Sequence, residues 1–295
     1  MTLTGLRHRE PPQAAWRSPD SPTARARFGE FQGDGLRVFA LKLTSMKDIP
    51  AGGYLGLDGC RAGWVVAQIG RLPGEVSLEV FSSFEAALAA HPGCLESWVD
   101  IPIGLSGGDV VRQLDTAMRA ALKSRKSSVF PAPCRAALTA ETYRQACQIE
   151  LSRYSRSLSV QAYHLIPKIR QVDWFLQAHP TWGGRVFESH PELCFQRLNG
   201  DRPLRYSKKE AAGWEERAAI LEEWLPDARR AALAFLCETR RAQVQPDDVL
   251  DALVLGVAAM LNQGRRDAFL HQPEEYDSAG VALRIACPPP LSGEV

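Results

Sequence analysis

The chain has 295 residues, of which 45% are apolar and 23% are charged, a length and balance typical of a globular protein with one sizeable core. Its formal net charge of +1 gives a weak overall field, which argues against a dedicated nucleic-acid binder unless a local basic patch does the binding. The seven cysteines include no C-x-x-C pair, so neither a zinc cluster nor a compact disulfide framework is expected, and they indicate a reducing cytoplasm.

Residues 1–45 differ in composition from the rest of the chain. They hold four prolines and six arginines and show little periodic apolar pattern, so we expect a disordered N-terminal extension. Met46 follows it and is an alternative start. Residues 46–295 are expected to form a single domain. No apolar run approaches the roughly 20 residues of a membrane span, and no signal peptide pattern opens the chain, so neither a membrane partner nor secretion is expected.

The first part of the body alternates between strand-like and helical patterns. Apolar runs predict three close strands, then a helix, then a fourth strand, at 54–58, 63–70, 75–81, 83–91 and 96–103. Three adjoining strands followed by a helix and another strand indicate an α/β fold with a mixed sheet flanked by helices.

The second part of the body is mainly helical. Helices are predicted over 109–123, 139–151, 159–178, 191–198, 208–224, 226–241 and 247–263. Pro167 should break or kink the third of these, because proline removes a helical hydrogen bond. A short strand is predicted at 185–189, and 281–286 is a candidate last strand.

The stretch "YLGLDGCRAGWVV" places Asp58 at the end of the first predicted strand. One interpretation is structural, because Asp-Gly is a common turn signal of β-hairpins. The other is chemical: a carboxylate at a strand end could form one corner of a metal site if other acids converge on it.

Asp100 and Glu188 are two further acids at predicted strand ends. Apolar residues on both sides of Asp100, in "WVDIPIGL", predict a strand buried on both faces, where a carboxylate is costly unless it is paired, hydrogen-bonded or bound to a metal. A helix cap or a partner for an arginine is the alternative. Glu188 precedes "HPE", so His190 and Glu192 could belong with it, although each could equally be a solvated or capping residue.

The last pair of acids lies in "PDDVLDALVLGVAAML". Pro246 suits a helix start, and Asp247 and Asp248 suit the positive end of the helix dipole, so capping alone could explain these two. Asp251 lies one turn further in and precedes a run that is apolar on all faces, which indicates a buried helix. Because Asp248 and Asp251 are three residues apart, they share a face of that helix.

Seven segments together resemble one protein family. They are "GLDGCRAGW", "VDIPIGL", "KSSVFPAP", "SVQAYHLIPKIRQVD", "ESHPELCFQRLNG", "SKK" and "DDVLDAL", in this order over residues 54–255. They look like the domain of unknown function family numbered 429, described as predicted ribonuclease-H-like nucleases. The chain departs from that pattern at Ala62, where glycine is usual, and at Tyr163, where tryptophan is common.

The resemblance implies a ribonuclease-H-like fold with three antiparallel strands, parallel strands after them, and a late helix that returns acids to the first strand. In that superfamily the metal-binding acids come from strand one, strand four and the late helix, which correspond to Asp58, Asp100, Asp248 and Asp251. The D-x-x-D-A spacing at 248–252 is also similar to that of the Holliday junction resolvase branch.

The implied function is a metal-dependent nuclease that hydrolyses phosphodiester bonds of nucleic acid by a two-metal mechanism, with ions about 3.5 to 4 Å apart. Mg²⁺ or Mn²⁺ is the expected cofactor, since carboxylate oxygens suit these ions. Glu188 is a fifth catalytic candidate. Basic residues could hold substrate phosphates or could simply form a solvated surface; they are Lys123, Arg125, Lys126, Lys208 and Lys209.

Two rival functions remain open at this level. An actin-like or sugar-kinase-like ATP-binding phosphotransferase would share the core fold, but it needs a second glycine-rich phosphate loop of the D-x-G-G type, and "LSGGDVV" at 105–111 has the order reversed. A non-catalytic module that binds nucleic acid is the other rival. The sequence leaves open whether the substrate is DNA or RNA, and what the oligomeric state is.

Overall fold

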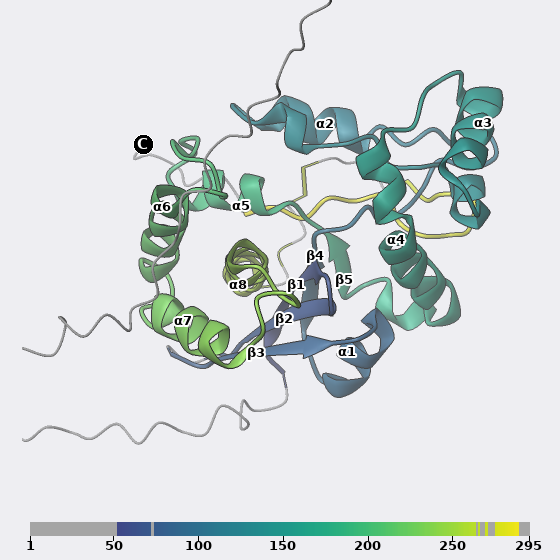
Figure 1. Ribbon diagram of the computed structural model, residues 1–295. Helices are drawn as coiled ribbons and strands as arrows, with labels where there is room; N and C mark the ends of the chain where they lie inside the picture. Colours follow the sequence, from purple (N-terminus) through teal and green to yellow (C-terminus); the bar gives the residue numbers. More distant parts are fainter. Residues whose placement is uncertain (1–51, 72–73, 264, 266–268, 271–274, 289–295) are drawn as a thin grey trace, which may run out of the picture. The chain divides into compact units, whose positions relative to one another are not determined.

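A five-stranded mixed sheet forms the centre of the fold, with the strand order β3-β2-β1-β4-β5 (Figure 1). Its strands are β1 (Tyr54–Cys60), β2 (Gly63–Ile69), β3 (Val76–Phe81), β4 (Glu96–Val99) and β5 (Val186–Glu188). The first three are antiparallel, and β4 and β5 run parallel to β1. The predicted α/β class with a helix-flanked mixed sheet is therefore confirmed. The computed structural model describes residues 52–71, 74–263, 265, 269–270 and 275–288, so the predicted extension at 1–45 lies outside the described residues.

The hairpin of β1 and β2 corrects one interpretation of Asp58. Both strands pair in register from Tyr54 and Ile69 to Cys60 and Gly63, so the turn lies after Cys60 and not at the Asp58-Gly59 dipeptide. Asp58 is itself a paired strand residue opposite Val65. Its position is therefore not explained by turn formation.

Two layers of helices cover the sheet (Figure 1). Apolar side chains of one sheet face pack with α1, α3 and α4, and those of the other face pack with α5 to α8. The helices are α1 (Phe84–Ala90), α2 (Leu114–Ala121), α3 (Tyr143–Tyr154), α4 (Val160–Ala178), α5 (Pro191–Leu198), α6 (Ala211–Glu222), α7 (Ala228–Glu238) and α8 (Pro246–Asn262). Every predicted helix is present, most with shorter bounds.

Helix α4 continues through Pro167, so the predicted break is absent. Ile166 and Ile169 are buried on either side of the proline, while Pro167 itself is exposed. The Ser159 side chain caps the helix by accepting a hydrogen bond from the Ala162 N–H at 3.1 Å. Packing of the buried face on both sides of the proline thus holds the helix together at a site where local propensity would interrupt it.

The predicted strand at 281–286 forms only single β-bridges in the described part of the chain. Ile285 bridges Glu188 in parallel and Ala282 bridges Tyr276. Strand β4 is also shorter than predicted, since it ends at Val99 before the proline at 102, which cannot donate a ladder hydrogen bond.

Helix α8 lies directly on β1. A Cβ atom at Gly56 would lie 2.0 Å from the Ala252 carbonyl oxygen and 2.2 Å from the Gly256 nitrogen, so only glycine permits this approach. Helix α8 is almost wholly buried, as predicted. Within the described residues no helix, α8 included, is long and apolar enough to cross a membrane.

Candidate functional site

Two of the predicted acids lie side by side at the carboxyl ends of β1 and β4. The Asp100 N–H donates to the Leu57 carbonyl at 3.0 Å, which continues the parallel pairing and places Asp100 next to Asp58. Strand side chains alternate between faces, so Asp58 shares a face with Gly56, the residue on which α8 packs. Asp58 is buried and Asp100 is half-buried.

Helix α8 brings Asp251 to the same place. The close contact at Gly56 leaves little space between strand and helix, and Asp251 precedes Ala252, whose carbonyl lies against that glycine. Asp251 is buried, and its carboxylate raises the pKa of both Asp58 and Asp100. Asp248 lies one turn earlier and has a capping role as well, since its carboxylate accepts from the Gln245 N–H at 2.8 Å.

Burial and neighbouring carboxylates disfavour the charged forms of the four aspartates. Burial raises the pKa of Asp58 well above its ordinary value, and the charges of Asp100 and Asp251 raise it further. Burial and then Asp251 raise the pKa of Asp100 to about 7, and burial raises that of Asp248 to about 6. Burial also raises the pKa of Asp251, against the opposing effect of Lys208. Clustered carboxylates of this kind attract a cation.

Glu188 lies near Asp100 but is already paired. One oxygen accepts from the buried Arg112 guanidinium at 2.5 Å, and the other accepts from the Ile103 N–H at 2.7 Å. Arg112 also bonds the Asp115 carboxylate at 3.0 Å. Burial raises the pKa of Glu188 to about 7 even though Arg112 lowers it. Glu188 therefore differs from Asp100, whose charged neighbours are other acids and Lys208.

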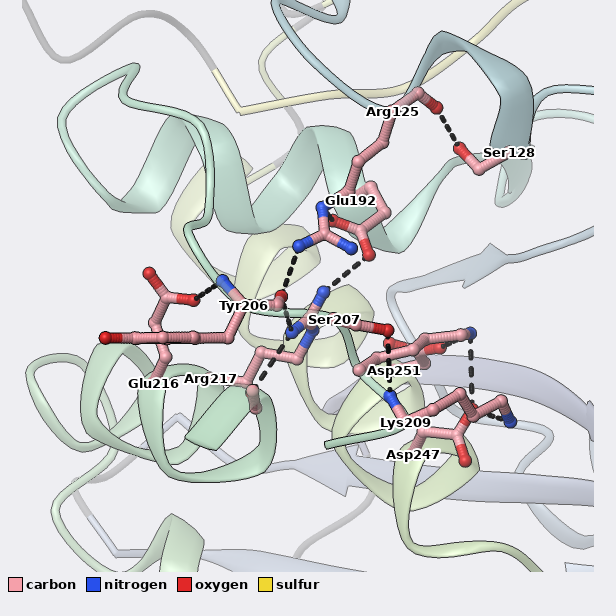
Figure 2. Close-up of polar contacts among 12 residues, drawn as sticks. Arg125, Ser128, Glu192, Tyr206, Ser207, Lys209, Glu216, Arg217, Asp247 and Asp251 are labelled. Atoms are coloured by element: carbon pink, nitrogen blue, oxygen red, sulfur yellow. Dashed lines mark hydrogen bonds and ion pairs between the residues drawn. The ribbon is translucent and has the colours of Figure 1, made fainter. Parts of the chain in front are cut away.

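Lys208 bonds directly to an acid of this cluster. Its Nζ lies 2.7 Å from Asp251 Oδ2 and 3.5 Å from Asp247 Oδ2. Burial alone would lower the pKa of Lys208, but Asp251 and Asp58 outweigh it and raise the pKa above its ordinary value. Figure 2 shows the segment that carries this lysine, from Tyr206 to Lys209, beside the acids of α8.

The other predicted phosphate-binding residues are placed differently. Lys123 pairs with Asp201 at 2.6 Å, and Lys209 pairs with Asp247 at 2.7 Å, so both ammonium groups already have a carboxylate partner. Lys126 is exposed. Arg125 donates to the Tyr206 carbonyl, and its Nε lies 3.7 Å from the Glu192 carboxylate (Figure 2).

A cavity of about 230 Å³ opens beside Asp58 and Asp100. Lys168 of α4 lines it and donates to the Gly63 carbonyl, while its Nζ lies 4.7 Å from the centre of the Trp64 ring. Sequence reasoning missed Lys168, since only the return of α4 over the β1–β2 hairpin brings it there. The remaining lining combines apolar side chains, among them Met118, Val129 and Phe130, with polar ones that include Asp115 and Glu188.

His190 lines the same cavity. Its Nε2 lies 3.4 Å from Ser128 Oγ, while its buried Nδ1 has no hydrogen-bond partner in the part of the chain that is described. Burial, with a smaller effect of Lys208, lowers the pKa of His190 to about 4, so the imidazole is neutral at pH 7. Glu188 lines this cavity as well, and no hydrogen bond joins it to His190 in the described residues.

The donor set consists of hard carboxylate oxygens, which suit Mg²⁺ and Mn²⁺. As the side chains stand, no three His, Cys, Asp or Glu residues among those described are grouped closely enough to hold one ion. The ammonium group of Lys208 takes up part of the coordinating capacity, since it bonds Asp251 directly. The donor chemistry therefore suits a divalent ion, whereas the side chains as they stand in the described residues do not close around one.

Comparison with known proteins gives one match. Searches of the curated proteins and of the solved structures found nothing that matches this chain. A family model described as "Protein of unknown function (DUF429)" matches residues 56–275, a range that includes all five candidate acids. The chain therefore belongs to the DUF429 family.

Proposed function

We propose that this protein is a metal-dependent phosphodiesterase with a ribonuclease-H-like fold that acts on nucleic acid. The observation that carries the proposal is the meeting of Asp58, Asp100 and Asp251. Asp58 and Asp100 are adjacent through the bond from the Asp100 N–H to the Leu57 carbonyl, and burial, with the charge of Asp251 adding to it, raises the pKa of both. Such a cluster is costly without a cation, and buried acids with perturbed pKa values beside a cavity are typical of catalytic sites.

The sheet supports the fold part of the proposal. Three antiparallel strands followed by two parallel ones, in the order β3-β2-β1-β4-β5, agree with the arrangement expected from the family resemblance. The acids also come from the expected elements, because Asp58 lies in β1, Asp100 follows β4 and Asp251 lies in α8.

Asp58, Asp100 and Asp251 would hold Mg²⁺ or Mn²⁺, and Asp248 would add the oxygen that does not cap α8. A bound ion supplies a water of lowered pKa and stabilises negative charge on the phosphate. In the hydrolysis, the water oxygen bonds to phosphorus, the bond from phosphorus to the sugar oxygen breaks, and that oxygen receives a proton. Lys168, which lines the cavity, would hold a phosphate oxygen, and the exposed Lys126 is a second lysine that we propose for this role.

The cysteines support a reducing compartment. All seven are free thiols, five of them buried. Since disulfides are rare in the cytosol and common in secreted proteins, we include a cytoplasmic location in the proposal.

The test is cleavage of single-stranded, duplex, hybrid and branched nucleic acids in Mg²⁺ or Mn²⁺, with an ATP-hydrolysis assay on the same preparation. We expect Asp58→Asn to lower turnover by about two orders of magnitude or more, because it removes a charge that holds the ion. Asp109→Asn is the matched control, since Asp109 is exposed.

Cleavage that is equal in the parent and in Asp58→Asn would indicate a contaminant and reject the assignment. Turnover of ATP without any cleavage would favour a phosphotransferase instead. Glu188→Gln should cost less activity than Asp58→Asn, because Glu188 is bound to Arg112 and the Ile103 N–H.

A further inference from the structure

Lys208 places a positive charge inside the acid cluster. Its Nζ is 2.7 Å from Asp251, whose side chain is only 3% exposed, whereas the lysine side chain is 36% exposed. The carboxylates of Asp58 and Asp100 also favour its charged form. The ammonium group is therefore bonded to Asp251, one of the three acids that would hold a metal ion.

The backbone immediately before Lys208 is anchored by α6. The Arg205 and Tyr206 N–H groups donate to the Glu216 carboxylate at 2.9 and 3.0 Å. A Cβ atom at Gly213 would lie 1.8 Å from the Ser207 carbonyl oxygen, so the segment packs directly on the helix backbone. These contacts hold the chain immediately before Lys208.

A buried arginine adds a second anchor to the same segment (Figure 2). Arg217 is fully buried, donates to the Gly213 carbonyl at 3.0 Å, and lies 3.4 Å from the Tyr206 carbonyl. It also pairs with Glu192 at 2.5 Å. Because an unpaired buried guanidinium is costly, this network resists displacement of the segment. The position of Lys208 is thus built into the fold, unlike that of a lysine on a free surface loop.

The charges of the cluster then set how many ions it can take. Lys208 contributes one positive charge beside Asp251, while Lys209 pairs with Asp247 outside the group. A divalent ion held by Asp251 would lie close to the ammonium group, which is 2.7 Å from that carboxylate. Like charges at such short range repel strongly when they are partly buried.

We propose that Lys208 is a resident cation that takes the place of one metal ion, so that the site binds a single divalent ion. This rests on the phosphodiesterase proposed above and replaces the two-ion expectation. The ammonium group provides fixed positive charge next to the single ion and stabilises negative charge on the phosphate. It is a positioning and charge-stabilising residue whose effect on ion binding can be measured without any substrate.

The experiment is a titration of the metal-free full chain with Mn²⁺, in which the ions bound per chain and their affinity are measured by calorimetry and electron paramagnetic resonance. We expect one ion for the parent. Lys208→Met should bind a second ion, or bind the first about tenfold more tightly or better, because a competing charge is gone. Lys209→Met is the matched control on the same segment, and Lys208→Arg keeps the charge; both should bind one ion as the parent does.

Two ions in the parent would overturn the role of Lys208 and leave the phosphodiesterase standing. The same number and affinity in Lys208→Met as in the parent, with circular dichroism showing an intact fold, would also overturn it. Absence of Mn²⁺ binding in the parent and in every variant would reject both the role of Lys208 and the metal-dependent function. Nucleic-acid cleavage that needs no metal would reject the function by a separate measurement.

Discussion

Asp100 has a pKa raised to about 7 by burial and by Asp251, so its charge state changes close to neutral pH. In an unfolded chain the same carboxyl ionises near pH 3.9, about the ordinary aspartate value. Between these values the folded state holds a proton that the unfolded state has lost. The free energy of unfolding therefore falls as the pH rises from about 4 to about 7.

We expect Asp100→Asn to raise the unfolding temperature of the metal-free protein at pH 8 and to leave it almost unchanged at pH 4. The variant removes a charge that burial and Asp251 disfavour, and this penalty exists only where the carboxyl is ionised. Thermal unfolding followed by circular dichroism at both pH values checks this. Equal shifts at the two pH values would show that the effect comes from packing and not from ionisation.

Only part of the site could be predicted residue by residue. Asp58, Asp100 and Asp251 were predictable because each is a carboxylate in an apolar context. Glu188 looks the same in the sequence, but Arg112, 76 residues away in the chain, neutralises it. Lys208 was expected only to bind phosphate. No local pattern reveals that its segment meets Asp251, 43 residues further on.

At the scale of elements, the contact of β1 with α8 determines how far Asp58 lies from Asp251. A methyl group at Gly56 would meet the α8 backbone at 2.0 Å, whereas one at Gly256 would first meet the Ile69 side chain at 2.8 Å. The α8 backbone can shift less than the Ile69 side chain can. In addition, alanine at position 256 lies within a helix, where it is intrinsically more favourable than glycine.

We expect Gly56→Ala to lower the free energy of unfolding by about 3 kcal/mol or more and Gly256→Ala to lower it by less. Gly184→Ala is the control, because nothing lies within 4 Å of its added methyl group. Urea unfolding gives the three values. A larger loss for Gly256→Ala than for Gly56→Ala would contradict the account of this contact.

Most elements followed from periodicity, and the exceptions have tertiary causes. The apolar runs of β1 to β3 and the helical patterns from α5 to α8 appear where expected. The proline in α4 is tolerated because buried residues on both sides of it pack on the sheet. The last predicted strand is reduced to bridges, and the Asp58-Gly59 turn signal is overridden by continued strand pairing. The helix and strand propensities of neighbouring residues cannot predict these outcomes, because each depends on contacts with residues far away in the sequence.

For the whole molecule, a ligand that binds only the folded state raises stability by mass action. We expect Mn²⁺ at about 100 times its dissociation constant to add about 2.7 kcal/mol, which is about 5 to 10 °C for a chain of this size. Asp58→Asn and Asp251→Asn should lose this shift, and the exposed Asp109→Asn should keep it. Thermal scans with and without Mn²⁺ measure it. A full shift in Asp58→Asn and Asp251→Asn would place the ion elsewhere.

The anchored segment before Lys208 also affects whether the chain can fold before a metal ion binds. Many small metalloproteins stay unfolded until their ion arrives, because nothing else offsets the repulsion among the ligands. Here a side chain of the same polypeptide brings compensating charge to Asp251 as soon as α6 and α8 come together. If the proposed metal site is right, the newly made chain can complete its native structure in an ion-poor cell and acquire the ion afterwards, so a shortage of metal would silence the protein without sending it to degradation.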